Sequence, residues 1–108
     1  MLTKYVVLFS TAPHEEEAAE IAHALVEKRL VACVNIVPKI RSVYTWQGKI
    51  CDEPEVLMIM KAQERMTDKI MAELKKLHSY ECPELISIPI TNGLPDYLSW
   101  IDEQSINL

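Results

Sequence analysis

The stretch KRLVACVNIVPKIRSVYTWQGKI, residues 28–50, decides the fold that the sequence predicts. It leads from the basic end of a predicted helix into a long extended segment that reaches a turn at Gln47 and Gly48. Pro38 interrupts this segment, and we expect an edge strand or a bend there because proline has no N–H to donate to a neighbouring strand. Glycine readily takes the positive φ of a two-residue hairpin, so the chain should return antiparallel after Gly48.

The outer part of this segment is an apolar arm. Strand alternation places Val43 and Thr45 on one face and Tyr44 and Trp46 on the other. Two aromatic side chains on a projecting hairpin expose more apolar surface than a small domain normally leaves in water. We therefore expect Tyr44 and Trp46 to pack on another copy of the chain.

The flanking segments follow the apolar periodicities of helices and strands. They are a buried strand at residues 4–10, a helix that begins at Pro13 and ends with Lys28 and Arg29, a second buried strand at residues 56–60 after the polar segment CDEPE, a helix at residues 64–77, an edge strand at residues 85–90 and a last helix with Asp96 as its N-cap. This order predicts a ferredoxin-like α+β fold, the split βαβ pattern plus a C-terminal helix, with helices on one face of an antiparallel sheet. A chain of 108 residues is expected to form one domain, residues 1–108.

Both faces of the predicted central strands are apolar, as in the runs VVLF at residues 6–9 and VLMIM at residues 56–60. Two helices can cover only one face of such a sheet. A monomer would leave the second face in water, where soluble monomers rarely keep large apolar patches. The pattern therefore predicts self-association through this face.

Composition excludes several classes of partner. The chain has 16 acidic and 11 basic residues, a formal net charge of -5, and no basic stripe that could follow a nucleic-acid backbone. No apolar run approaches the roughly 18 residues that cross a membrane, and the first residues, MLTKYVVLFS, lack the pattern of an export signal. Cys33, Cys51 and Cys82 form no closely spaced pair, which favours reduced thiols in the cytoplasm.

The segment HSYE, residues 78–81, is the richest polar group. His78 has the chemistry to bind a metal or carry a proton near neutral pH, with Glu81 to orient it and Tyr80 as a hydrogen-bond donor. The structural alternative is that His78 caps the preceding helix and Glu81 pairs with a lysine. No GxSxG, P-loop or HExxH motif is present, so we expect that the protein is not an enzyme. The weaker alternative is an enzyme that uses His78 and Glu81 as acid and base.

Four segments in this order resemble the CutA family, named for divalent-cation tolerance: FSTAP at residues 9–13, ACVNIVPKIRSVYTWQGKI at 32–50, LHSYECPE at 77–84 and YLSWI at 97–101. The resemblance covers essentially the whole chain. It implies a ferredoxin-like subunit in a homotrimer similar to the PII signalling proteins. It also implies a cleft between subunits.

The resemblance implies a set of residues for that cleft. Lys61, Tyr80, Glu81 and Trp46 match its lining, and Trp46 and Tyr44 match residues of the trimer interface. For both aromatics, packing between subunits is the alternative to ligand binding, because aromatic residues commonly anchor interfaces.

The resemblance also implies copper binding, but the matching ligand positions are altered. Ser10 stands where the family has a cysteine, Leu77 where it has a first histidine, and His78 is the one histidine retained. Cys82, four residues further on, is a candidate replacement ligand, since copper favours thiolate and imidazole. Ser79 replaces the usual proline. The candidate metal residues are thus His78, Cys82 and Ser10, for copper or another divalent metal.

Together these features predict a CutA-like divalent-cation tolerance protein: a non-catalytic cytoplasmic homotrimer with weak metal binding. The alternative is a PII-like sensor or scaffold that binds a small anionic molecule in the cleft, with Lys61 supplying the positive charge.

Overall fold

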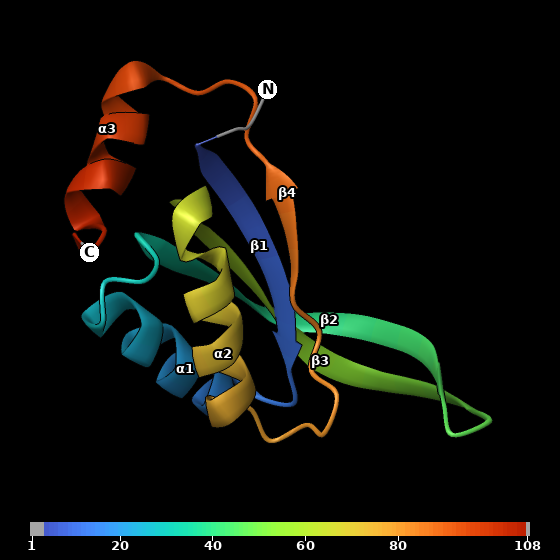
Figure 1. Cartoon of the computed structure of the whole chain (residues 1–108). Coiled ribbons are helices and arrows are strands. Elements are labelled where there is room, and N and C mark those ends of the chain that lie inside the picture. The colour runs from blue at the N-terminus through green and yellow to red at the C-terminus, as the bar shows by residue number, and fades with distance from the viewer. Residues whose placement is uncertain (1–3, 108) are drawn as a thin grey trace.

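Four strands form one antiparallel sheet in the computed structural model, which describes residues 4–107 (Figure 1). They are β1 (Tyr5–Ala12), β2 (Cys33–Trp46), β3 (Lys49–Gln63) and β4 (Ile86–Pro89), in the spatial order β2-β3-β1-β4. The helices are α1 (Glu15–Glu27), α2 (Thr67–Leu77) and α3 (Pro95–Gln104), with a 3₁₀ turn η1 (Glu64–Met66) before α2. Element order and topology confirm the ferredoxin-like α+β fold. The first three residues of MLTKYVVLFS lie outside the described part of the chain.

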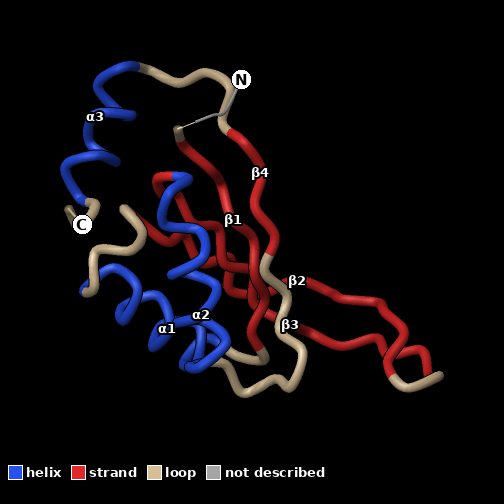
Figure 2. The backbone as a smooth tube through the Cα atoms, viewed as in Figure 1, coloured by secondary structure: helices blue, strands red, loops and turns tan. Residues whose placement is uncertain are grey.

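Helices α1 and α2 cover one face of the sheet, as Figure 2 shows. Alternate residues of the two central strands point toward them, because successive side chains of a strand face opposite sides. The buried core that results joins β1, β3, α1 and α2: Val6, Leu8, Ala12, Ala18, Ile21, Leu25, Val56, Met58, Met60, Ala62, Ile70 and Leu74. The helix-covered face therefore supplies the hydrophobic core of the subunit.

The opposite face of the sheet is also apolar, as the sequence predicts. Val7 of β1 pairs with Ile88 of β4, and Phe9 pairs with Ile86. Ile86 is 52% exposed and Ile88 48% exposed. Within one chain, most of this second face remains open to solvent.

The β2–β3 hairpin forms the arm that the sequence predicts. Its strands pair out to Trp46 and Lys49, and its outer half projects beyond the rest of the sheet (Figure 1). Gln47 and Gly48 have φ of 51° and 78°, the positive values of a two-residue hairpin turn. The register is irregular between Val37 and Ile40. This bulge on an edge strand confirms the expectation for Pro38.

Strand β3 is longer than predicted. The polar segment CDEPE, residues 51–55, was expected to precede the strand, but it lies within β3. The reason is the length of the β2 arm, because every residue of the arm needs a strand partner on its hairpin side. Glu55, at the base of the arm, is 8% exposed, although the sequence places it in a polar segment.

Helix α1 is shorter than predicted. Pro13 precedes it, and His14 is the N-cap, where Nδ1 accepts a hydrogen bond from a backbone N–H of the first turn at 3.2 Å. Lys28 and Arg29 follow the helix instead of forming its last turn. Arg29 has a φ of 59°, the left-handed conformation that commonly ends helices.

Helix α3 begins at Pro95, so Asp96 lies in its first turn and is not the N-cap. The helix lies against the end of the sheet where β1 begins and β3 ends. There Asp102 accepts hydrogen bonds from Tyr5 Oη at 2.7 Å and Gln63 Nε2 at 2.5 Å. Among residues 4–107, no helix is long and apolar enough to cross a membrane.

Candidate functional site

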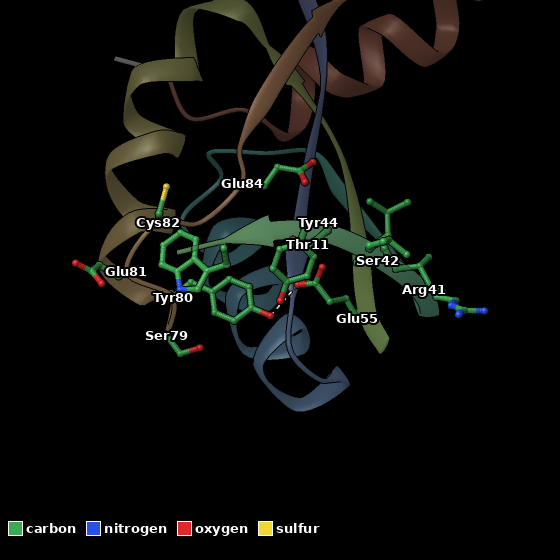
Figure 3. A pocket seen from close by; sticks show the side chains of 14 residues that line it. Thr11, Arg41, Ser42, Tyr44, Glu55, Ser79, Tyr80, Glu81, Cys82 and Glu84 are labelled. Atoms are coloured by element: carbon green, nitrogen blue, oxygen red, sulfur yellow. Dashed lines mark hydrogen bonds between the residues drawn. The ribbon is translucent and has the colours of Figure 1, made fainter. Parts of the chain in front are cut away.

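A cavity of about 840 Å³ lies where the arm leaves the sheet (Figure 3). Residues 40–46 of β2 form one wall, residues 79–84 after α2 form another, and side chains of β1 and β3 form the floor. Its size is that of a small-molecule site. The cavity joins three segments that are far apart in the sequence.

A hydrogen bond between Tyr80 and Glu55 crosses the floor. Tyr80 Oη donates to Glu55 Oε2 at 2.7 Å, the bond drawn dashed in Figure 3. Burial, followed by the hydrogen bond and charge of Glu55, raises the pKa of Tyr80 far above its ordinary value. The phenol therefore stays neutral and acts as a donor at physiological pH.

A second carboxylate, Glu84, lines the same cavity. Partial desolvation, and then the negative charge of Glu55, raise the pKa of Glu84. Ser10 Oγ donates to the backbone carbonyl of Glu84 at 2.6 Å, from a fully buried position on β1. Ser10 thus holds the Glu84 backbone beside the sheet.

His78 anchors the loop that carries Tyr80. Its Nε2 donates to the Thr11 carbonyl at 2.6 Å, and its Nδ1 accepts from the Tyr80 backbone N–H at 3.0 Å. In these two hydrogen bonds Nε2 is the donor and Nδ1 the acceptor. Glu17 Oε2 lies 3.3 Å from Nδ1 and accepts from the Ser79 backbone N–H at 3.1 Å. Both nitrogens of His78 are therefore engaged within the chain.

The structure brings some of the predicted cleft residues together. Tyr80, Glu81, Trp46, Tyr44 and Cys82 all line the cavity. In Figure 3 the Glu81 side chain points away from the bonded Tyr80. The residues expected to bind a ligand and those expected to bind a neighbouring subunit thus line the same cavity.

Lys61 lies elsewhere. It is near the end of β3 remote from the cavity, opposite Cys33 of β2, and its Nζ donates to Asn35 Oδ1. Within one chain, Lys61 does not belong to the cavity that holds Tyr80.

The predicted metal ligands form no coordination site within one chain. Among residues 4–107, no group of three or more His, Cys, Asp or Glu side chains is arranged to hold a metal ion. His78 has both nitrogens engaged, and Ser10 already donates its hydroxyl proton. Cys82 is an exposed free thiol on the cavity wall. The metal site at His78, Cys82 and Ser10 stays a prediction.

Sequence reasoning missed Glu55, Glu84 and Glu17. The sequence places Glu55 in a polar segment, because the four preceding residues, CDEP, do not suggest a buried strand. Glu17 was assigned to the first turn of a helix, as a favourable charge for the helix dipole. A signal for Glu55 does exist, because it lies two and four residues before Leu57 and Ile59 and so shares their face of the strand.

Comparison with known proteins identifies close relatives. A family model described as "CutA1 divalent ion tolerance protein" matches residues 6–104. "Divalent-cation tolerance protein CutA" of Thermus thermophilus is 43% identical over 99 residues, 92% of this chain and 96% of that protein. "Protein CutA" of Mus musculus is 45% identical over 95 residues, 88% of this chain, and the chain spans about half of that protein, 54%. The crystal structure of CutA1 from Oryza sativa superposes with a TM-score of 0.94 at 36% identity, over 98% of this chain and 97% of that one.

Proposed function

Because the chain belongs to the CutA1 divalent ion tolerance protein family, we propose that it acts as a non-catalytic homotrimer that binds copper or another divalent metal weakly. We also propose a cytoplasmic location, which the three free cysteines support. The assembly and the metal have separate support and separate tests.

The open apolar face of the sheet carries the proposal of an assembly. Ile86 and Ile88 of β4 are about half exposed, and the neighbouring strand β1 adds Val7 and Phe9 to the same face. Burying apolar surface stabilises an association by roughly 25 cal/mol per Å² before the entropic cost of association. Packing of these faces in three copies, with Tyr44 and Trp46 contacting neighbours, would remove this surface from water.

Light scattering on the purified protein tests the assembly. We expect the mass of three chains for the wild type and a smaller mass for Ile88→Asp, which places a charge on the second face. Val26→Asp is the matched control, because Val26 is 41% exposed on α1, on the other side of the sheet. A monomeric wild type would contradict the proposal.

Cys82 is the main support for metal binding, since it is an exposed free thiol on the cavity wall and copper favours thiolate. His78 would have to give up a hydrogen bond to join it. With no group of three His, Cys, Asp or Glu donors among residues 4–107, these residues fit a weak site better than a dedicated copper centre.

Calorimetric titration of the freshly reduced protein with Cu²⁺ and Zn²⁺ tests the metal. We expect weak saturable binding that Cys82→Ser and His78→Ala reduce and Lys61→Ala leaves unchanged. If both Cys82→Ser and His78→Ala bind like the wild type, the metal site does not include the predicted residues.

A second function has support from the cavity itself: binding of a small molecule by a PII-like sensor or scaffold. Its volume of about 840 Å³ and its convergent aromatic and polar side chains favour it. Because Lys61 of the same chain lies outside this cavity, an anionic ligand would depend on Lys61 of a neighbouring copy, so Lys61→Ala should abolish its binding while His78→Ala should not.

A further inference from the structure

The inner wall of the cavity beside the arm is negatively charged. Glu55 and Glu84 line it. Arg41 also lines it, but its guanidinium points away from the other labelled side chains in Figure 3. The same guanidinium forms two hydrogen bonds with Asp52 of the arm, at 2.8 and 2.7 Å, which neutralise its charge. A cation that enters the cavity would therefore meet two carboxylates.

Glu55 has acceptor capacity that the chain does not use. The residue is only 8% exposed, and its Oε2 accepts the hydrogen bond from Tyr80. Among residues 4–107, Tyr80 is the one hydrogen-bond donor to this carboxylate. An ionised carboxylate can accept about four hydrogen bonds. Among residues 4–107, no partly buried side chain has an unpartnered oxygen that is sealed from solvent. The other oxygen of Glu55, Oε1, is available to a donor on a ligand.

Aromatic side chains flank these carboxylates. Tyr44 and Trp46 come from the arm and line the same cavity, and within one chain they keep 38% and 44% of their surface exposed. Aromatic faces attract cations and also pack well against carbon chains. The wall from the arm thus complements an organic cation in both charge and apolar surface.

We propose that this cavity binds a primary organic ammonium ion, whose N–H groups donate to Glu55 and Glu84 and whose carbon skeleton packs on Tyr44 and Trp46. An N–H donor is needed because the unused oxygen of Glu55 is a hydrogen-bond acceptor. The inference rests on the second proposed function, small-molecule binding in this cavity, and names its ligand class as a cation.

Calorimetric titration of the full chain with phenethylammonium tests this assignment at low salt and neutral pH. We expect one site per chain, with affinity at least tenfold higher than for the neutral 2-phenylethanol. The trimethylated ammonium, which lacks N–H donors, should also bind at least tenfold more weakly. Glu84→Gln should weaken phenethylammonium binding about five- to tenfold. Glu27→Gln, which removes the same charge from the exposed end of α1, should change it less than twofold.

Four results would overturn the inference. They are equal binding of phenethylammonium and 2-phenylethanol, equal effects of Glu84→Gln and Glu27→Gln, tighter binding of the anion 3-phenylpropionate, and no binding of any probe. Tighter binding of the anion would keep small-molecule binding and reject the cation, whereas no binding of any probe would reject both. A thermal melt of each variant shows that it is folded.

A lysine side chain of a second copy offers the same ammonium chemistry. In that case free phenethylammonium would compete with association, and its apparent affinity would fall as the protein concentration rises. An affinity independent of protein concentration assigns the site to a free amine.

Discussion

The two ends of the β1–β3 ladder hold carboxylates in opposite surroundings. Where Tyr5 pairs with Gln63, Asp102 of α3 accepts hydrogen bonds from both side chains and from a lysine. At the other end, Glu55 accepts one hydrogen bond, from Tyr80, and faces a cavity. Asp102 accepts hydrogen bonds from three side chains of its own chain and serves to attach α3. Glu55 accepts one, and this difference separates a structural carboxylate from one available to a ligand.

The pKa values follow the same division. Burial raises the pKa of Asp102, but the hydrogen bonds from Gln63, Tyr5 and Lys4 outweigh it, so the pKa lies below its ordinary value of 3.8. Glu84, in the cavity with Glu55, has a pKa raised above its ordinary value of 4.5 by desolvation and then by the charge of Glu55. One end favours ionised carboxylates and the other disfavours them.

The largest effect should come from breaking the structural end. Asp102→Ala removes the acceptor for three side chains and leaves partly buried donors unpaired, which should lower the free energy of unfolding by about 2–3 kcal/mol. Urea denaturation at fixed protein concentration measures this loss. Glu103→Ala, the next residue of α3, is the control and should stay within about 0.5 kcal/mol of wild type. Equal losses for the two variants would reject the structural role of Asp102.

A smaller effect should follow at the cavity end. Tyr80→Phe removes the one donor to the buried carboxylate of Glu55, and we expect a loss of about 1–2 kcal/mol in the same measurement. Tyr44→Phe is the matched control, because Tyr44 Oη donates to Glu53 at 3.3 Å in an exposed position. It should cost less than about 0.5 kcal/mol. A loss for Tyr44→Phe as large as that for Tyr80→Phe would count against a special role for Glu55.

The smallest effect, and the sharpest contrast, is in the pH dependence of stability. Because the pKa of Asp102 is lowered on folding, its ionised form stabilises the folded state above pH 3.8. This stabilisation is lost as the pH falls through the lowered pKa. The raised pKa of Glu84 has the opposite sign, since folding favours its protonated form and this contribution is lost as the pH rises above 4.5.

Denaturation series from about pH 3 to about pH 7 separate the two signs. Asp102→Asn should have a lower free energy of unfolding than wild type at neutral pH, and this difference should shrink toward acid pH. The free energy of unfolding of Glu84→Gln relative to wild type should increase as the pH rises through 4.5 and then through the raised pKa of Glu84. The same sign for both variants would contradict the difference between the two ends.

The fold could be predicted from the sequence because its decisive features are local. The Gln47-Gly48 turn, the interruption at Pro38 and the apolar runs of the central strands each act over a few residues, and the structure has all of them. The family resemblance through segments such as LHSYECPE was confirmed by the match to residues 6–104.

The site was predicted less well because its geometry depends on contacts far apart in the chain. The burial of Glu55 follows from its pairing with Ile40 of β2 and its bond to Tyr80, and neither contact is visible in the local sequence. For His78, the residue type suggests a ligand, whereas the engaged state of both nitrogens depends on Thr11 and on the loop backbone.

The bulge in β2 decides which chemistry the arm offers to the cavity. Val37 pairs with Leu57 and Ile40 pairs with Glu55, so β2 advances three residues between these pairs while β3 advances two. Each single-residue change in strand register exchanges the two faces. A deletion of one codon here would turn the aromatic face of the arm outward and present its β-branched face to the carboxylates. Variants of this protein, natural or designed, can therefore change residues 38 and 39 more safely than they can change the number of residues between the two pairs.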